Sequence, residues 1–175
     1  FLISVDCGIT SVEEVQLARE LGMTVVISDH HTPGAKLPDA DAIVHPGIES
    51  YPFAGLCGAG VALKIAWAFC KRVSGGEKVE PRFREFLVSA LALAAIGTVA
   101  DVAPLIGVNR AFVRQGLKVM AARQRLGLRV LADVARIDTA PTSYHLGFLL
   151  GPRINAGGRI GQADLGARQP LHAAG

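Results

Sequence analysis

Two short apolar runs flank an amphipathic stretch at the start of the chain. Residues 2–6, "LISVD", and residues 23–29, "MTVVISD", are rich in β-branched residues and are predicted to be strands. Between them Ser11 and Glu14 form a capping-box pattern, apolar residues recur at helical spacing, and Gly22 stands where a helix would end. The pattern predicts a right-handed β-α-β unit whose parallel strands are buried on both faces.

The pattern continues with one more strand and several helices. We expect a third strand over residues 41–46 and helices over residues 55–73, 81–95, 109–123 and 126–135. Asn109 is predicted to cap the helix that it begins. The segment "GFLLGPRINAGGRIG" combines glycine, proline, asparagine and arginine, and is predicted to be a loop that cradles an anion.

The order of these elements indicates an α/β fold, namely a parallel-sheet domain with helices on both faces followed by a mainly helical segment. The longest apolar stretch, residues 86–100, stops at Asp101 and falls short of the roughly 20 residues that a membrane span needs. We therefore expect a buried helix and a strand there, and no membrane association. Trp67 and Phe69 are expected in the core. The isolated histidines His45 and His145 are expected to be structural.

Charge is distributed unevenly along the 175 residues. Residues 1–101 contain 8 Lys and Arg against 12 Asp and Glu, a balance of −4, whereas residues 102–175 contain 10 against 3, a balance of +7. An acidic part beside an arginine-rich part fits a cation site that faces an anion-binding surface, although a solvated surface without function explains the composition equally well. The 3 cysteines have no CxxC spacing, which argues against a disulfide framework or structural zinc site and fits a reducing cytoplasm.

Acids and histidines collect where the predicted strands end. Asp6, Asp29, His30, His31 and Asp101 all follow apolar runs, and the carboxyl ends of parallel strands open onto one crevice. Asp6 and Asp29 should emerge close together, because neighbouring strands lie about 4.8 Å apart. Carboxylates with imidazole suit Mn²⁺ or Mg²⁺, which support phosphoester hydrolysis. A single Asp at a strand end is more often a turn residue, so the argument depends on these residues occurring together.

Five segments, in order along the chain, carry a family resemblance. They are "VDCGITSVEEV", "SDHHTPG", "LCGAGVALK", "GTVADVAPL" and "GPRINAGGRIG". These segments resemble successive motifs of the DHH phosphoesterase superfamily, and the last two are similar to the RecJ family of single-stranded-DNA-specific 5′ to 3′ exonucleases. Five ordered segments are far more specific than the three letters DHH alone.

The resemblance implies a role for each matching residue. Asp6, His30 and Asp101 would be ligands of Mn²⁺ or Mg²⁺. Asp29 and His31 would be the catalytic pair, in which Asp29 supports the histidines and His31 contacts the scissile phosphate or assists the leaving group. Substrate would be bound by Arg153, Asn155, Arg159, Gly58 and Gly60. The arginines would act through bidentate hydrogen bonds and the glycines through close backbone approach, although helix packing also explains the glycines.

The resemblance also implies a domain organisation. Residues 1–105 would be a partial DHH catalytic domain whose first motif lies upstream. Residues 106–175 would be a truncated helical continuation that carries the arginine-rich substrate-binding loop. The tail after Ala167 departs from the helical pattern expected there, so the chain is expected to be a fragment.

The function that follows from the resemblance is metal-dependent 5′ to 3′ hydrolysis of single-stranded DNA, in DNA repair and recombination in the cytoplasm. A single-stranded-DNA-binding protein or a helicase is a candidate partner. Two alternatives stay open. One is a DHH-type phosphoesterase that acts on short oligonucleotides or cyclic dinucleotides, and the other is a fragment that binds nucleic acid without catalysis.

Overall fold

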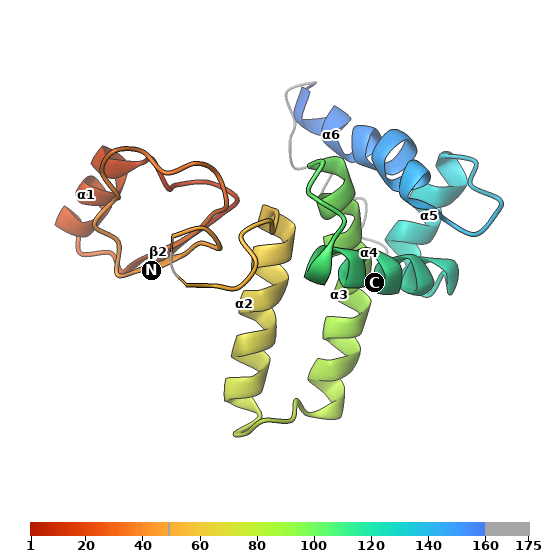
Figure 1. Ribbon diagram of the computed structural model, residues 1–175, viewed down its shortest axis with the longest axis horizontal. Helices are drawn as coiled ribbons and strands as arrows, with labels where there is room; N and C mark the ends of the chain where they lie inside the picture. The colour runs from red at the N-terminus through yellow and green to blue at the C-terminus, as the bar shows by residue number, and fades with distance from the viewer. Residues whose placement is uncertain (49, 160–175) are drawn as a thin grey trace.

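The first part of the described chain forms a three-stranded parallel sheet (Figure 1). The structure is a computed structural model that describes residues 1–48 and 50–159, without the side chains of residues 157–159. The elements of the first part are β1 (Leu2–Val5), α1 (Val12–Glu20), β2 (Val25–Ser28) and β3 (Ala42–Val44). The strands lie in the order β1-β2-β3, and their last residues are side by side in the register. Asp6, Asp29 and His45, which directly follow the three strands, therefore leave the sheet at the same edge.

Burial in the sheet is confined to the central strand. Val25 and Ile27 of β2 are 0% and 1% exposed, whereas Ile3 and Val5 of β1 are 49% and 52% exposed. The prediction of strands buried on both faces is therefore right for β2 and wrong for β1 and β3 in the described part of the chain. The reason is that the helices α1 and α2 (Gly58–Val73) both pack against β2.

The ends of α1 lie where the sequence places them, with one difference. Ser11 is the N-cap residue, but its side chain makes no capping hydrogen bond, so the predicted capping box is not formed. Gly22 has a φ of 77°, the left-handed conformation in which glycine commonly ends a helix.

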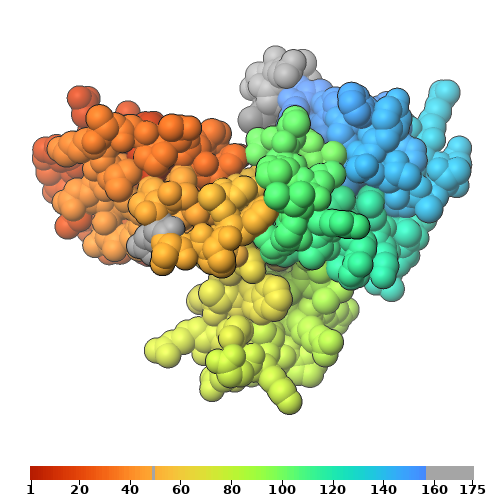
Figure 2. All heavy atoms as spheres, in the orientation of Figure 1, coloured from red at the N-terminus to blue at the C-terminus, as the bar shows by residue number. Residues whose placement is uncertain are grey.

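Helices make up most of the chain after the sheet. They are α2, α3 (Pro81–Ala100), α4 (Gly107–Ala121), α5 (Leu126–Val134), the π-helical segment η1 (His145–Leu150) and α6 (Gly151–Arg159). In Figure 1, α2 and α3 form a long hairpin beside the sheet, and α4, α5 and α6 lie on the other side of α3. Figure 2 shows the tip of this hairpin projecting from the body of the molecule. The predicted α/β class, with a parallel sheet followed by a mainly helical segment, is confirmed.

The central helix α3 continues to Ala100, so the strand expected before Asp101 is absent from this described segment. Periodicity does not separate a short buried strand from a buried helix, and the many alanines here favour the helix. α3 packs against both α2 and α4. α4 packs along α3, across the predicted boundary at residue 105. The division into two domains stays a prediction.

By length and composition α3 is apolar enough to cross a membrane, and it is the one described helix of which this is true. This is weak evidence for a membrane span, because a helix in the core of a helical domain has the same composition. α2 and α4 pack against α3, and Leu87, Ala92 and Ala95 of α3 belong to the apolar clusters that they form.

The predicted anion-binding loop, residues 147–161, is wrong as a loop over residues 147–159, which are helical. Its last two residues lie outside the described part. Pro152 does not end this helical run. It follows directly after the π-helical segment η1, and the helix continues without a break from η1 into α6.

Asn109 does not cap α4. The N-cap residue is Ile106, and the fully buried Asn109 donates from Nδ2 to Gly55 O at 2.6 Å and to Pro104 O at 3.0 Å. Asn109 thereby ties the segment that precedes α2 to the turn between α3 and α4.

The expectation that Trp67 and Phe69 lie in the core is wrong. Their exposed fractions are 45% and 66%. Trp67 instead contacts the ammonium of Lys64, which lies 5.4 Å from the ring centroid.

Gly116 controls how closely α3 and α4 approach, which leads to a first prediction. An added Cβ at Gly116 would lie 2.5 Å from Ala95 Cβ and 2.5 Å from the backbone oxygen of Leu91. Gly116→Ala should therefore lower the free energy of unfolding by about 1–3 kcal/mol, measured by urea denaturation. The matched control is Gly76→Ala, where an added Cβ meets no atom within 4 Å. Equal stability of the two variants would contradict the prediction.

Candidate metal centre

Three side chains that commonly bind metals converge at the edge of the sheet. Asp6 follows β1, and His30 and His31 follow β2; one donor atom from each lies within 4.8 Å of the others. His30 Nε2 is 3.0 Å from Asp6 Oδ1 and 3.7 Å from Asp101 Oδ2. The structure thus brings the three predicted ligands Asp6, His30 and Asp101 around one point, and their assignment as metal ligands stays a prediction.

Asp101 reaches this point from a helix and not from a strand. It is the C-cap residue of α3, and its backbone N–H donates to Gly97 O at 2.9 Å. The next residue, Val102, has a φ of 55°, which is rare for a β-branched residue. Unusual backbone conformations of this kind concentrate at functional sites. Here the sharp turn ends α3 at the residue whose carboxylate faces His30.

Asp6 also has an uncommon backbone conformation, and it lies against α2. Its φ of 65° is in the left-handed region, which Asp tolerates better than most residues. Gly58, the first residue of α2, is so close that an added Cβ would overlap the Asp6 carboxylate. The carboxylate therefore lies beside the N-terminal turn of α2, where the helix dipole favours a negative charge.

The two glycines expected at the site have different surroundings. Gly58 provides the close approach of α2 to Asp6. Gly60 faces Leu56, whose Cδ2 would lie 3.2 Å from an added Cβ, and the Gly60 N–H donates to Cys57 Sγ at 3.4 Å. Gly60 therefore serves the packing and capping of α2, and a role of either glycine in substrate binding stays a prediction.

Asp29 is a buried carboxylate that accepts hydrogen bonds from two segments. Oδ2 accepts from the N–H of Ile9 at 3.0 Å. Oδ1 accepts from the N–H of His30 at 2.7 Å, and from the N–H and Nδ1 of His31 at 3.2 Å and 2.7 Å. Burial by itself raises the pKa of Asp29, but these hydrogen bonds outweigh it and lower the pKa from 3.8 to about 2. Asp29 is therefore ionised and fixes the backbone that carries both histidines.

His31 is the exposed member of the histidine pair. Its side chain is 58% exposed, and its ring lies 4.4 Å from the ring of His30. The hydrogen bond to Asp29 raises the pKa of His31, and the negative charges of Asp29, Asp6 and Asp101 act in the same direction. Because Asp29 accepts from Nδ1, the other ring nitrogen, Nε2, is left to act as a donor or a ligand.

His45 bonds only to backbone atoms among the described residues, which agrees with the structural role expected for it, and it supports the segment that carries His31. The Gly47 N–H donates to His45 Nδ1 at 3.0 Å, so Nδ1 is the acceptor and Nε2 carries the hydrogen. That Nε2–H donates to the backbone oxygen of His31 at 2.8 Å. The place of His45 directly after a third parallel strand was the available signal, because such residues share one sheet edge.

Comparison with known proteins identifies the family. A family model described as "DHH family, N-terminal domain" matches residues 1–98. The chain belongs to the DHH family. The Asp-His-His sequence stands at residues 29–31, and its two histidines belong to the cluster described above.

Curated relatives of this DHH-family chain are single-stranded-DNA-specific exonucleases named RecJ. The protein from Bacillus subtilis is 44% identical over 166 residues, which are 93% of this chain and 20% of that protein. The protein from Escherichia coli K12 is 39% identical over 171 residues, which are 94% of this chain and 30% of that protein. The chain therefore spans between a fifth and a third of the length of these relatives.

Solved structures of RecJ show the same fold. A crystal structure of exonuclease RecJ bound to manganese matches with a TM-score of 0.84 at 38% identity, over 98% of this chain and 42% of that chain. RecJ from Thermus thermophilus in complex with Mn²⁺ matches with a TM-score of 0.82 at 38% identity, over 97% of this chain and 24% of that one.

In this DHH-family chain the predicted phosphate-binding residues Arg153, Asn155 and Arg159 all belong to α6. Arg153 and Asn155 are exposed, and Arg153 Nη1 donates to Leu149 O at 2.7 Å. The side chain of Arg159 lies outside the described part. α6 begins against the end of α3, because an added Cβ at Gly151 would lie 3.0 Å from Ala100 Cβ. This contact places the start of α6 beside the residue that precedes Asp101.

The network around Asp29 leads to a second prediction. Asp29→Asn should lower the free energy of unfolding by about 2 kcal/mol at neutral pH, because an amide nitrogen would face backbone N–H donors. The pKa of Asp29 is lower in the folded protein, so its contribution is complete above about pH 4 and is lost as the pH falls through about 2.

Urea denaturation at pH 7 and at pH 2.5 would measure the difference between wild type and variant. The matched control is Asp39→Asn, because the Asp39 side chain is 88% exposed and pairs only with Arg19 among the described residues. A difference for Asp29→Asn that does not shrink at low pH would contradict the assignment.

Proposed function

We propose that this chain carries the metal centre of an exonuclease that hydrolyses single-stranded DNA from 5′ to 3′. The observation that supports it is the meeting of Asp6, His30 and Asp101 at the carboxyl edge of the sheet, with Asp101 Oδ2 at 3.7 Å and Asp6 Oδ1 at 3.0 Å from His30 Nε2. The RecJ relatives are 38–44% identical over most of this chain, and their names indicate single-stranded DNA as the substrate. Because the chain spans only part of their length, the activity of the whole protein is a proposal here.

The donor set fits Mn²⁺ or Mg²⁺. Two carboxylates and one imidazole are ligands that these ions accept, and no thiolate lies among the donors of the described cluster. Similar RecJ structures hold manganese or magnesium. Asp6, His30 and Asp101 would hold the ion, which when bound would supply Lewis-acid chemistry for phosphodiester hydrolysis.

Asp29 and His31 would provide the proton transfer that accompanies bond cleavage. Water supplies the oxygen that joins phosphorus, and the bond from phosphorus to the departing sugar oxygen breaks. That oxygen needs a proton, and His31 Nε2 can donate it because the Asp29 carboxylate raises the pKa of His31 and holds its other nitrogen. The half-exposed position of His31 leaves Nε2 accessible to substrate.

The helical part would bind the strand. Arg153 and Asn155 lie exposed on α6 next to the end of α3, and residues 102–175 carry a net charge of +7. Guanidinium groups bind phosphate through paired hydrogen bonds, so we assign Arg153, Asn155 and Arg159 to the DNA backbone. Affinity for single-stranded DNA should then fall steeply with salt.

Several finer assignments rest on the resemblance alone. They are action in DNA repair and recombination, a cytoplasmic location, and partnership with a single-stranded-DNA-binding protein or a helicase. The alternatives, a phosphoesterase for short oligonucleotides or cyclic dinucleotides and a non-catalytic nucleic-acid-binding fragment, are separated from the exonuclease by the following experiment.

The third prediction tests the function with His30→Ala in the full-length gene product. The variant should lose Mn²⁺-dependent release of nucleotides from 5′-labelled single-stranded DNA by at least about 100-fold, because a metal ligand is removed, while its melting temperature changes little. His145→Ala is the matched control, since His145 bonds only to Thr142 among the described residues.

Faster hydrolysis of dinucleotides than of long strands by the wild type would favour the small-substrate alternative. Salt-dependent DNA binding without hydrolysis would favour the non-catalytic one. Unchanged specific activity of His30→Ala would contradict the assignment of His30 as a metal ligand.

The fourth prediction concerns Gly58→Ala. The added methyl group would displace the Asp6 carboxylate from His30, so the affinity for Mn²⁺ should fall about tenfold in isothermal titration calorimetry. The added Cβ would also lie 2.7 Å from Asp6 Cβ, a contact that rotation of the carboxylate does not relieve, so the melting temperature should fall as well. Gly76→Ala should bind Mn²⁺ like the wild type. Unaltered affinity in Gly58→Ala would show that Asp6 is not a ligand.

A further inference from the structure

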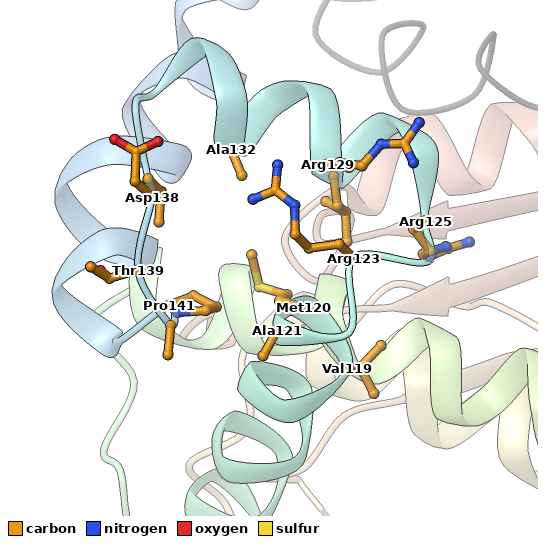
Figure 3. A pocket seen from close by; sticks show the side chains of 13 residues that line it. Val119, Met120, Ala121, Arg123, Arg125, Arg129, Ala132, Asp138, Thr139 and Pro141 are labelled. Carbon is orange, nitrogen blue, oxygen red and sulfur yellow. The ribbon is translucent and has the colours of Figure 1, made fainter.

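A second candidate binding site lies at α5, across α3 from the metal centre (Figure 1). It is a pocket of about 300 Å³ between the end of α4, α5 and the segment that precedes η1 (Figure 3). None of the residues that line it belongs to the metal centre. The proposed function gives this pocket no role.

The rim of this α5 pocket is strongly basic. Arg123, Arg125 and Arg129 line it, against a single acid, Asp138. Arg123 extends across the pocket in Figure 3 and pairs with Asp133 of α5. Arg125 Nη1 is buried and has no hydrogen-bond partner among the residues that the structure describes. A buried guanidinium N–H without an acceptor is costly, so a side-chain rotation that brings this group of Arg125 to an acceptor in the pocket would be favourable.

The electrostatics of α5 favour an anion at the same place. Arg125 is the N-cap residue of this 9-residue helix, no side chain caps it, and its first turn contains no acid. Arg125 and Arg129 are four residues apart, a spacing at which like charges repel each other. Positive side chains at the positive end of a helix dipole are also unfavourable. A phosphate group there would relieve both penalties and accept from the first N–H groups of α5.

The interior of the α5 pocket is apolar and small. Met120, Leu128 and Ile137 are 7%, 5% and 3% exposed and contribute to its lining. A volume of about 300 Å³ is at the lower end for small-molecule sites, which run to roughly 1,000 Å³. An anionic group beside a compact apolar body matches this combination, and a nucleotide has both parts.

We propose that the α5 pocket binds one nucleotide unit, with its phosphate on Arg125 and Arg129 and its sugar or base over the apolar interior. This site goes beyond the proposed function, because it is separate from the metal centre. The unit has two sources, a free deoxynucleoside monophosphate or a nucleotide within a strand. A strand has room to continue, because Arg125 also lines a neighbouring hollow of about 850 Å³ that contains Lys118 and Arg84.

The test uses the 175-residue chain in EDTA, so that no metal-dependent binding contributes. The probes are thymidine monophosphate, thymidine, inorganic phosphate and a 12-residue oligothymidylate, titrated by isothermal calorimetry. The double variant Arg125→Gln/Arg129→Gln removes the two guanidinium groups, and Thr139→Trp fills the pocket without a change of charge. Arg110→Gln/Arg114→Gln removes the same charge from exposed positions of α4 outside the pocket.

We expect thymidine monophosphate to bind and thymidine not to bind. The double variant and Thr139→Trp should each weaken binding by about tenfold or more, and the α4 control by less than about twofold. Oligothymidylate that binds tighter than the monophosphate, with the same loss in both pocket variants, identifies the strand as the source. Equal affinities identify the free nucleotide.

The proposal is overturned if neither nucleotide probe binds at millimolar concentration, if the pocket variants bind like the wild type, or if the α4 control loses as much affinity as the double variant. Circular dichroism of each variant establishes that it is folded. If the double variant fails to fold, the nucleotide affinity of Thr139→Trp alone tests the proposal. The test is independent of hydrolysis, so its failure leaves the proposed function untouched.

Discussion

The buried charge of Asp29 is the constraint on which the candidate site depends. A carboxylate that is 1% exposed is tolerated only where hydrogen bonds replace the lost water, and Asp29 accepts four of them. These bonds fix the backbone of both following histidines and join them to Ile9 in the turn after β1. The positions of His30 and His31 are therefore set by the folding of the β-α-β unit and need no ion to hold them.

Close helix packing brings the remaining members of the site to the sheet. An added Cβ at Gly97 would lie 2.5 Å from Ala59 Cβ, so α2 and α3 approach each other with almost no side chain between them. This approach places the start of α2, with Gly58, and the end of α3, with Asp101, at the same sheet edge. The site thus combines strand ends and helix ends, and each contributes a carboxylate to one point.

The sequence was sufficient to predict the β-α-β unit and the meeting of Asp6 with the histidines, because parallel strands of equal register must end together. It was insufficient for Asp101 and α6. The periodicity of a short apolar run before an acid does not separate a strand from a helix, and here the alanine content and the packing against α4 favour the helix. Proline and glycine in "GPRINAGG" indicate a loop, yet the helix continues from the π-helical segment η1 through Pro152 into α6. The place of His45 after a third strand indicates the sheet edge at which it lies, but its bond to the backbone oxygen of His31 is one that no side-chain pattern reveals.

The two helix ends give the two carboxylates opposite electrostatic surroundings. Asp6 lies beside the positive end of α2, whereas Asp101 caps α3 at the negative end of its dipole. In the cation-free protein, the last turn of α3 therefore carries a local repulsion that fraying of that turn would relieve. A bound divalent cation would remove this repulsion, so ion binding and the order of the α3 terminus should be thermodynamically linked.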